Sequence, residues 1–370
     1  MGNSVPDTLQ KFGLCRRCLL RQGNSARFQQ IPAAKCFICR GLTSKLLAFA
    51  KWAASKGRAY EYRTFSIGLT LPEGVQERED ELRAESKIKG FETIKSEMSR
   101  IISREISRLT GKRVDKMTPE LMVLLNLQDH KITLTSRPVF LYGRYTKPEG
   151  LSQRKERCPH CGGRGCEVCK ETGFDLKTSV EVVLQRKLGS ALESDGVRIT
   201  WMGSEDAESL VHPPGRPFIA EVKNPKKRGV PKRLFARTGK GEVQISHIRT
   251  LLGKPTKLPS FKFRARAYIE PTNKISPRDL RALNLGMNRV TVEFQRPQQR
   301  PIYRTVYSVR GKLAGDEVVV DIEMDGGLPV KRFVSGEAVS PSLSEVLKTE
   351  LKCRKFDIYR VSETSELEFA

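Results

Sequence analysis

The chain has 370 residues, with 67 Lys and Arg against 42 Asp and Glu and a formal net charge of +25 at pH 7. One hydrophobic core rarely organises so long a chain, so we expect two or three domains, and a positive field of this size favours a nucleic-acid partner. No apolar run approaches the roughly 20 residues of a membrane-spanning helix, and the polar start MGNSVPDTLQ has no secretory signal. We therefore expect a soluble, cytoplasmic protein without membrane contact.

A cysteine-rich segment and a helix come first in chain order. LTSKLLAFAKWAASKG (42–57) repeats apolar side chains at helical spacing and ends at Gly57. From Tyr62 to Leu71 apolar and polar residues alternate, which predicts a half-buried strand. The acidic run EGVQEREDELRAE (73–85) indicates a solvated loop and the start of a helix.

A long helix and three short strands follow. Apolar residues between Ile88 and Leu109 form one stripe along an amphipathic helix. The three stretches that indicate short strands are ELMVLLNL (120–127), KITLT (131–135) and PVFLYG (138–143). We expect this helix and these strands to form a compact α+β unit over residues 58–153, after an N-terminal region of residues 1–57.

The C-terminal part, residues 176–370, is expected to fold around a sheet. KTSVEVVLQRKLGSALES (177–194) has helical periodicity, with Thr178 or Ser179 as its N-cap. Eight later stretches indicate strands: VRITWM (197–202), PFIAEV (217–222), VQIS (243–246), FKFRARAYIE (261–270), VTVEF (290–294), YRTVYSV (303–309), EVVVDIE (317–323) and FDIYRV (356–361). With Pro and Gly turns between them, they predict a mixed, largely antiparallel sheet.

Eight of the nine cysteines fall into four Cys-x-x-Cys pairs, which leaves Cys353 alone. Two thiolates two residues apart can bind one tetrahedral ion, so two pairs complete a structural zinc site. The expected ligands are Cys15, Cys18, Cys36 and Cys39 in residues 1–57, and Cys158, Cys161, Cys166 and Cys169 in a knuckle over residues 154–175. A redox dithiol, a chaperone-type cysteine repeat and buried inert thiols are the alternatives, and the more distant N-terminal pairs allow ligation across domains. We expect two zinc ions.

Three motifs, together with the paired cysteines and in the same order, resemble one family. FLYGRYTKPEGLSQRK (140–155), GSEDAESLVHPPGRPFIAEV (203–222) and GGLPVKRFVSGEAVSPSL (326–343) are similar to stretches of the archaeal and eukaryotic tRNA pseudouridine-54/55 synthases. The cysteine arrangement resembles the archaeal form. The resemblance implies an N-terminal zinc-binding and THUMP-type α/β region followed by a pseudouridine synthase catalytic domain over residues 176–370, an α+β multidomain protein.

By this resemblance Asp206 is the catalytic aspartate. A carboxylate suits the reaction because it can stabilise or capture oxocarbenium character at C1′ of the ribose when the bond to N1 of uracil breaks. An ionised carboxylate in an enclosed pocket needs a nearby cation, and similarity to the wider superfamily makes Lys331 that partner. The alternatives are a turn or cap residue for Asp206 and an exposed lysine on a strand for Lys331.

The resemblance also implies residues that bind the everted base, namely Phe263, Pro329, Leu343 and Arg216. Phe263 and Pro329 stand where the family tends to have tyrosines, and a phenylalanine can stack on a base but cannot donate a hydroxyl hydrogen bond. Leu343 would line the floor of the pocket, and Arg216 would form a local ion pair or contact a phosphate. Core packing is the alternative for Phe263 and Leu343, and Glu205 and Glu208 are expected in solvent or in salt bridges.

Two basic stretches are expected to contact RNA phosphates, which adds salt-dependent affinity without sequence information. The residues expected to do so are Arg144, Tyr145 and Lys147 in the first motif, and Lys226, Lys227 and Arg228 in KNPKKRGVPKR (223–233). A solvated charge run is the alternative for the second stretch.

The sequence therefore predicts a monomeric tRNA pseudouridine synthase without an organic cofactor or obligatory protein partner, acting on uridine 54 or 55 of the TΨC loop or on both. One rival is another THUMP-type RNA-modifying enzyme, which would need a nucleotide-derived or methionine-derived cofactor. No Gly-rich loop between a strand and a helix is evident for such a cofactor. The other rival is a zinc-containing RNA-binding protein that has lost catalysis.

Overall fold

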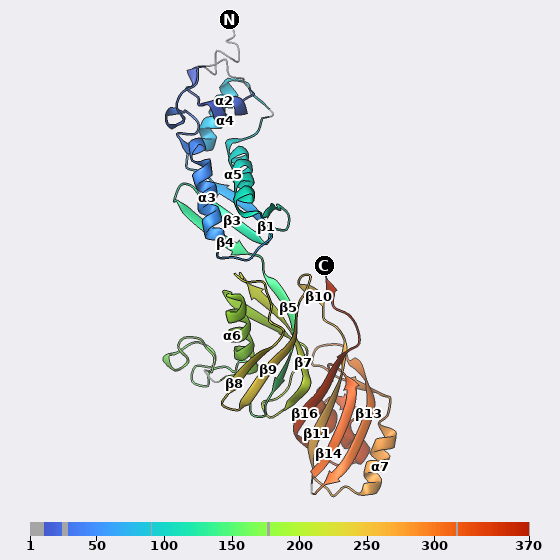
Figure 1. Cartoon of the computed structure of the whole chain (residues 1–370). Coiled ribbons are helices and arrows are strands. Elements are labelled where there is room, and N and C mark those ends of the chain that lie inside the picture. Colours follow the sequence, from blue (N-terminus) through green and yellow to red (C-terminus); the bar gives the residue numbers. More distant parts are fainter. Residues whose placement is uncertain (1–10, 24–28, 90, 176–177, 316, 370) are drawn as a thin grey trace. The chain divides into compact units, whose positions relative to one another are not determined.

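The computed structural model describes residues 11–23, 29–89, 91–175, 178–315 and 317–369. They form two compact units (Figure 1). The N-terminal unit contains the chain up to Arg137 together with Asn224–Arg228, and the C-terminal unit contains Pro138–Lys223 and the chain from Gly229 onwards. Among the described residues, no helix combines the length and the apolar character needed to cross a membrane.

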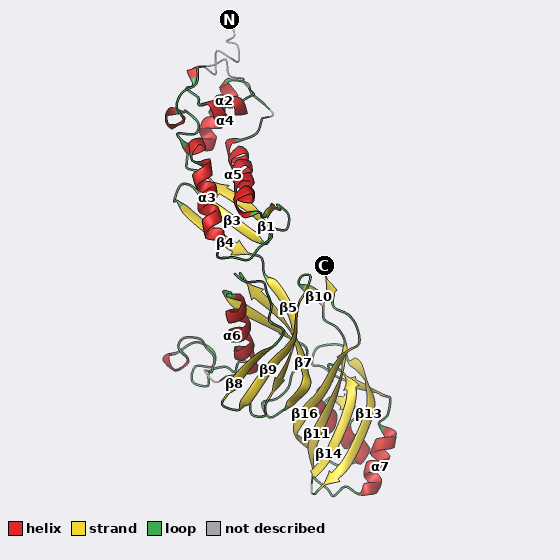
Figure 2. Ribbon diagram, viewed as in Figure 1, coloured by secondary structure: helices red, strands yellow, loops and turns green. Residues whose placement is uncertain are grey.

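The N-terminal unit packs helices on a four-stranded sheet. Its described elements are α2 (Arg16–Arg21), 3-10 turns at Ala33–Lys35 and Leu42–Ser44, α3 (Leu46–Gly57), β1 (Thr64–Thr70), α4 (Val75–Glu85), α5 (Ile94–Thr110), β2 (Arg113–Val114), β3 (Leu121–Asn126) and β4 (Lys131–Ser136). The strand order is β2-β1-β3-β4; β1 runs parallel to β2 and β3, whereas β4 is antiparallel to β3. Helices α3 and α5 pack on each other and against this sheet (Figure 2).

Helix α5 confirms the long amphipathic helix that the sequence predicts, with a later start. The side chain of Thr93 accepts a hydrogen bond from the Ser96 amide at 3.2 Å, so the helix begins at Ile94. Its buried stripe contains Met98, Ile102 and Ile106. The helix ends at Gly111, whose left-handed φ of 69° suits glycine.

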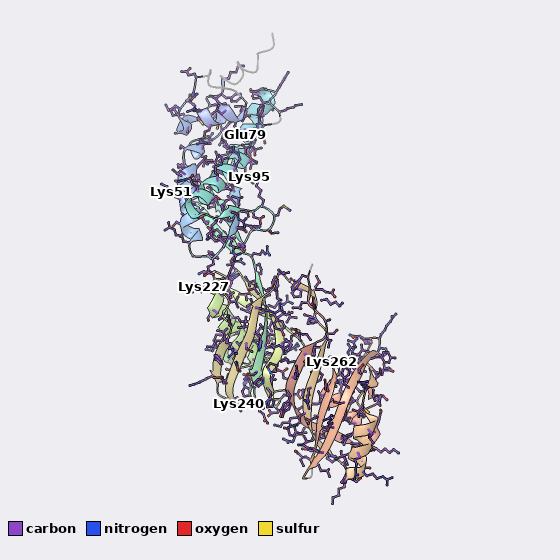
Figure 3. The ribbon with its side chains drawn as sticks, turned by 45° about the vertical axis from the view of Figure 1, so that its right-hand side comes forward. Lys51, Glu79, Lys95, Lys227, Lys240 and Lys262 are labelled. Atoms are coloured by element: carbon purple, nitrogen blue, oxygen red, sulfur yellow. The ribbon has the colours of Figure 1, made fainter. Side chains whose placement is uncertain are left out.

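Helix α4 corrects the expectation for the acidic run 73–85, which forms a complete helix rather than a solvated loop and a helix start. Glu79 on α4 is 2% exposed and lies inside the N-terminal unit, where Figure 3 labels it. Its Oε1 lies 2.7 Å from Nε of Arg21, and Nη1 of Arg21 lies 2.7 Å from Oε2 of Glu97. A buried charge needs such partners, and the acidic sequence alone did not show that α2 would supply one.

The C-terminal unit is built around a mixed sheet. Its described elements are β5 (Val139–Lys147), a 3-10 turn at Glu167–Cys169, α6 (Val180–Leu192), β6 (Gly196–Trp201), β7 (Val211–Lys223), β8 (Leu234–Thr238), β9 (Gly241–Thr250), β10 (Pro255–Lys257), β11 (Phe261–Pro271), α7 (Pro277–Gly286), β12 (Val290–Phe294), β13 (Ile302–Ala314), β14 (Glu317–Asp325), α8 (Val330–Ser335), β15 (Val339–Ser340), α9 (Leu343–Leu347), β16 (Leu351–Glu363) and β17 (Glu368–Phe369). Within the described residues the large sheet has eleven strands in the order β15-β12-β13-β14-β11-β16-β7-β5-β9-β8, with β6 beside β7. β10 pairs separately with β17.

The large sheet is mostly antiparallel, as the sequence predicts. The pairing of β16 with β7, through Ile358 and Val211, is parallel. On β11 the predicted alternation holds: Phe263, Ala265 and Ala267 are buried, whereas Arg264, between the first two, is exposed. Helix α6 packs against β6, β8 and β9, while α7 covers β13 and α8 packs against β16.

The strand β5 lies in the C-terminal sheet, which differs from the expected domain boundary near Gln153. Leu141 on β5 pairs with Ala220 of β7 on one side and with Thr250 of β9 on the other. Leu141 and Tyr145 are fully buried in the core of the C-terminal unit. The structure therefore divides the chain between Arg137 and Pro138.

The buried charge network of the N-terminal unit gives a stability prediction. Glu79→Gln removes one carboxylate from Arg21, and losing one partner of a buried ion pair costs about 3–5 kcal/mol. We expect the opening free energy of α4 and α5 to fall by about 3 kcal/mol, measured by hydrogen exchange of peptides from both helices in the full-length protein.

Glu105→Gln is the matched control on α5. Glu105 pairs with Arg108 at 2.5 Å, but the Arg108 side chain is 68% exposed. Exposed pairs contribute little, so this variant should exchange like the wild type. Equal destabilisation by the two substitutions would contradict the role given to the Arg21 network.

Candidate active site

A cavity of about 370 Å³ lies in the C-terminal unit, within the size range of small-molecule and cofactor sites. Most of its wall comes from the loop between β6 and β7, the start of β11, and the segment from Gly327 into α8, to which β7, β16 and the residues after α8 add one side chain each. Its walls contain Gly203, Ser204, Glu205, Asp206, Arg216, Phe261, Phe263, Gly327, Leu328, Pro329, Val330, Lys331, Arg332, Glu337 and Phe356.

Asp206 and Lys331 meet in the wall of this cavity. Oδ2 of Asp206 lies 2.7 Å from Nζ of Lys331, and the two side chains are 43% and 48% exposed. Asp206 comes from the β6–β7 loop, whereas Lys331 is in the first turn of α8, not on a strand. The ammonium group stabilises the ionised carboxylate, and both groups remain accessible from the cavity.

Glu205, next to Asp206, anchors the loop in the interior. Its side chain is fully buried, and Oε2 lies 3.1 Å from Nη1 of Arg216, whose side chain is 6% exposed. The Tyr145 hydroxyl donates to Oε1 of Glu205 at 2.6 Å and accepts from Nε2 of Gln153 at 2.8 Å. Burial raises the pKa of Glu205, and Arg216 and the Tyr145 hydroxyl oppose that shift. The sequence left Glu205 either in solvent or in a salt bridge, and Arg216 either in a local ion pair or at a phosphate. The structure pairs the two residues with each other.

Lys147 holds the loop on the other side of Asp206. Its side chain is buried, and Nζ donates to the carbonyl of Ala207 at 2.9 Å and to the carbonyl of Ser209. Arg216 similarly donates from Nε to the carbonyl of Met202 at 3.2 Å. The residues flanking Asp206 are therefore fixed by buried cations that bind main-chain carbonyl groups.

Three of the four expected base-binding residues line the cavity, and one does not. Phe263 is 7% exposed and presents an apolar wall from β11, Pro329 precedes α8, and Arg216 is present through its pair with Glu205. Leu343 is fully buried at the start of α9, in the core of the C-terminal unit and outside the cavity lining. Leu343 is therefore a core leucine, the alternative to the predicted floor of the pocket.

The three cations in the cavity wall are each paired with a carboxylate. Lys331 pairs with Asp206 and Arg216 with Glu205, as described above. Nη2 of Arg332 lies 3.3 Å from Oε1 of Glu337. The lining is thus close to electrically neutral, which suits an uncharged group such as a nucleobase.

Arg144, Tyr145 and Lys147, which the sequence analysis expected to contact RNA, instead make contacts within the C-terminal unit. Tyr145 and Lys147 are 0% and 1% exposed, so their side chains support the loop of Asp206 instead of lying at the surface. Nη1 of Arg144 donates to the carbonyls of Gly215 and Val361 at 3.0 and 2.8 Å, and Nη2 lies 3.0 Å from Glu363. These contacts hold β5, β7 and β16 together.

The second group lies on Asn224–Arg228, which packs with the N-terminal unit. Nη2 of Arg228 donates to the Glu120 carbonyl at 3.1 Å and to the Arg137 carbonyl at 2.9 Å. The Lys226 carbonyl accepts from the Glu61 amide at 2.7 Å. The side chains of Lys226 and Lys227 are exposed, and Figure 3 labels Lys227.

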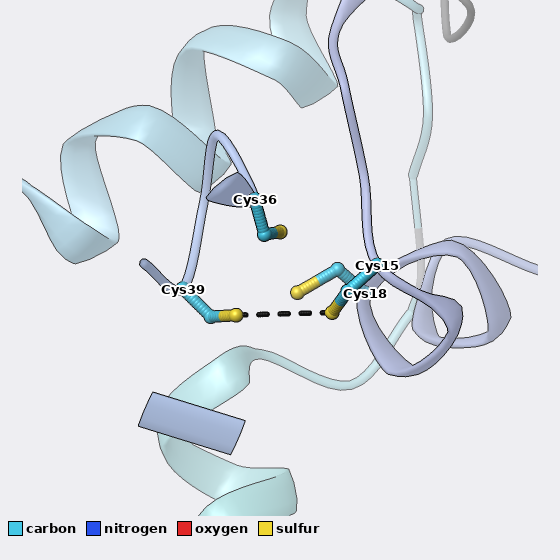
Figure 4. Close-up of side chains that lie close together, drawn as sticks. All are labelled: Cys15, Cys18, Cys36 and Cys39. Atoms are coloured by element: carbon cyan, nitrogen blue, oxygen red, sulfur yellow. Dashed lines mark hydrogen bonds between the residues drawn. The ribbon is translucent and has the colours of Figure 1, made fainter. Parts of the chain in front are cut away.

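The eight paired cysteines gather into two clusters, each with all four sulfur atoms within 4.8 Å of one another. Figure 4 shows the first, made by Cys15, Cys18, Cys36 and Cys39, where the Cys15 and Cys39 sulfur atoms are 3.7 Å apart. In the second, the sulfur atoms of Cys158 and Cys166 are 3.9 Å apart, and those of Cys161 and Cys169 are 3.8 Å apart. A tetrahedral ion with bonds of about 2.3 Å to sulfur requires about 3.8 Å between sulfur atoms. Both clusters therefore fit such an ion, and each pair combines with its neighbour in the sequence.

Sequence reasoning missed several residues of the cavity. Phe261, Arg332 and Glu337 line it, and only the short spacing of Phe261 from Phe263 and of Arg332 from Lys331 was a signal. Cys353, which the sequence left alone, is 8% exposed, and burial raises the pKa of its thiol to about 12. It is a neutral core thiol.

The fold and the site together are those of a THUMP-containing RNA-modifying enzyme. The model of the archaeal Pus10 THUMP domain matches residues 49–126, and the model of the Pus10 C-terminal region matches residues 140–362. The chain belongs to the Pus10 family of tRNA pseudouridine synthases.

Curated relatives match nearly the whole chain. A tRNA pseudouridine synthase Pus10 of Nitrosopumilus maritimus is 30% identical over 95% of this chain and 96% of its own length. That of Cenarchaeum symbiosum is 34% identical over 89% of this chain and 81% of its own length. Among solved structures, a Cbf5-Nop10-Gar1 complex aligns with a TM-score of 0.31 and 9% identity over 50% of this chain and 46% of that chain.

The burial of Lys147 gives a pH prediction. Burial lowers the pKa of Lys147 from 10.5 to about 8. Between these values the unfolded chain holds the proton that the folded chain has lost, so the contribution of Lys147 to stability rises with pH in this window. We expect the unfolding free energy of the wild type, relative to Lys147→Met, to increase between about pH 7.5 and about pH 9.5 in urea titrations. A constant difference, or a decrease, would show that this lysine does not titrate in the interior.

Proposed function

We propose that this protein isomerises uridine to pseudouridine in the TΨC loop of tRNA, at position 54, position 55 or both. One observation carries the proposal: the 2.7 Å pair of Asp206 and Lys331 in the wall of a cavity with the dimensions of a ligand site. Membership of the family and the net charge of +25, which favours RNA, support it.

Asp206 is the catalytic residue in this proposal. Its carboxylate stabilises or captures the positive charge that develops at C1′ while the bond from C1′ to N1 of uracil breaks. The freed base keeps the bonding electrons, turns, and forms a bond from C5 to C1′. C5 then loses its proton and N1 gains one, so substrate and product are isomers. Because no electrons or groups are gained or lost, the reaction needs no organic cofactor.

The neighbouring residues have positioning and binding roles. Lys331 pairs with the carboxylate and orients it, and the ion pair of Glu205 with Arg216 fixes the loop from which Asp206 projects. Phe263 and Pro329 offer apolar surfaces on which an everted base can lie, offsetting part of the unstacking cost of a few kcal/mol. Neither can donate a hydrogen bond from its side chain, so the base is held by shape more than by polar contacts.

We assign a structural zinc ion to each cysteine cluster. Four thiolates saturate a tetrahedral ion, so neither site retains a position for a substrate or a catalytic water. In the first cluster Nη2 of Arg21 lies 3.4 Å from Sγ of Cys18 and offsets part of the negative charge of four thiolates. His160, inside the second cluster's first turn, is not required as a ligand.

The catalytic role of Asp206 has a direct test. Asp206→Asn keeps the size of the side chain but removes the charge, and loss of a reacting group lowers a rate by about 10³-fold or more. We expect the variant to form no measurable pseudouridine in an unmodified tRNA transcript while its affinity for that tRNA stays within about threefold of the wild type. Sequencing of the modified bases locates the product.

Glu208→Gln is the control, because Glu208 is an exposed carboxylate two residues away. It should retain wild-type turnover. Comparable turnover in Asp206→Asn, or equal loss in both variants, would refute the assignment. A wild-type protein that binds tRNA without making product would instead support the non-catalytic alternative.

The zinc assignment predicts the metal content of the purified protein. We expect about two zinc ions per chain in the wild type and about one in Cys36→Ser or Cys161→Ser, measured by elemental mass spectrometry. Cys353→Ser is the matched control, because Cys353 lies outside both clusters, and it should keep two. Less than one ion in the wild type, or an equal loss in the control, would overturn the assignment.

A further inference from the structure

A second cavity, of about 410 Å³, adjoins the one that contains Asp206. The two share three wall residues, Gly203, Phe261 and Gly327. The other walls of the second cavity are Pro259, Ser260, Arg304, Asp325 and Gly326. It lies between the open end of the β13–β14 hairpin, where β13 begins and β14 ends, and the start of β11.

The ring of Phe261 lines both cavities, and neighbouring glycines leave room for it. A Cβ on Gly326 would lie 2.4 Å from Cε2 of Phe261, and a Cβ on Gly203 would lie 3.5 Å from its Cζ. The amide of Gly326 also donates to the Phe261 carbonyl at 2.6 Å. A chain of nucleotides that enters the first cavity therefore meets an aromatic wall on its way to the second.

Arg304 is the cation of the second cavity, and main-chain groups fix its position. Nε donates to the Gly326 carbonyl at 2.8 Å, and Nη1 donates to the Tyr303 carbonyl at 2.8 Å. A Cβ on Gly327 would lie 3.5 Å from Nη2, so the guanidinium group rests against the wall that both cavities share. Among the described residues Arg304 has no carboxylate within ion-pair distance, unlike the three cations of the first cavity.

Asp325 brings a negative charge to the same cavity, but neighbouring groups bind its carboxylate. Oδ2 accepts from the Thr305 amide and Oδ1 from the Tyr307 hydroxyl, both at 2.9 Å. Lys262, opposite Asp325 in the pairing of β11 with β14, places Nζ 3.6 Å from the centre of the Tyr307 ring. Figure 3 labels Lys262 on this strand. Among the described residues, the wall of this cavity therefore contains one cation, Arg304, and one carboxylate, which other groups already bind, while Lys262, the strand partner of Asp325 on β11, lies outside the wall.

We propose that Arg304 binds the phosphodiester group next to the target uridine, and that the second cavity takes the adjoining nucleotide. The inference rests on the proposed function, since it assumes that the first cavity holds a uridine. A neutral cavity suits the base, and a guanidinium with fixed orientation and no direct ion-pair partner among the described residues suits a phosphate. Phe261 separates the two nucleotides and presents a ring on which a base can stack.

The protein side of the test compares Arg304→Gln with Arg310→Gln. Arg310 lies on the same strand, is exposed, and lines neither cavity, so its loss removes the same charge elsewhere. We expect Arg304→Gln to raise the enzyme concentration for half-saturation about tenfold in single-turnover assays, with the saturating rate changed by less than about twofold. The slope of log affinity against log salt should fall by about one in Arg304→Gln. Arg310→Gln should match the wild type in half-saturation and in saturating rate, and equal effects of the two variants would overturn the proposal.

The substrate side uses the unaltered protein. Ligated tRNAs carry one neutral methylphosphonate, either on the 5′ or on the 3′ side of the mapped target uridine. One of the two should weaken wild-type binding about tenfold and have no further effect on Arg304→Gln. If neither weakens wild-type binding, or if both proteins are weakened equally, Arg304 does not bind this phosphate.

These outcomes separate the inference from the proposed function. A wild type that forms pseudouridine but binds both methylphosphonate tRNAs normally refutes the phosphate contact alone. A wild type that forms no product refutes the proposed function.

Discussion

The buried ion pair of Glu205 with Arg216 is the contact on which the active-site loop depends. Removing two charges from water is costly, and here the Tyr145 hydroxyl donates to Oε1 of Glu205 while the main-chain carbonyls of Met202 and Ser204 accept hydrogen bonds from Arg216. Asp206, the next residue, is 43% exposed and pairs with Lys331 in the cavity wall. The acidic cluster of this basic protein thus contains an internal anchor, Glu205, directly before Asp206, the proposed catalytic carboxylate.

The pair of Asp206 and Lys331 shows what could and could not be predicted from the sequence. The motifs around Asp206 and Lys331 identify each residue by resemblance, but 2.7 Å between them follows from a sheet that brings α8 beside the β6–β7 loop. Tyr145 and Lys147 were taken for RNA contacts because they lie in a basic stretch. In a strand, residues at every second position share one face, so Tyr145 and Lys147 lie on the same face of β5 as Val139 and Leu141. This spacing was the signal in the sequence that they face the core, where all four side chains are buried.

Regular alternation of apolar and polar residues made the strands of the C-terminal sheet predictable, whereas its short helices α7, α8 and α9 were not predicted. Helix α7 begins after the N-cap Ser276 with Pro277, and Asp279 completes a capping box, a local signal that predicts a helix start at this position. The boundary of the N-terminal unit at Arg137 could not be predicted from the sequence. Strand β5 pairs with β7, whose residues follow some seventy positions later, and such pairing depends on the folded sheet and not on local composition.

The segment Asn224–Arg228 has a consequence for how the protein is made. It completes the surface of the N-terminal unit through Glu61, Glu120 and Arg137, although β5, α6 and β7 are synthesised before it. While the chain is still emerging from the ribosome, the first unit must wait for this late segment before all its contacts form. The polypeptide also crosses between the units three times, so a single proteolytic cut at any one crossing leaves them joined.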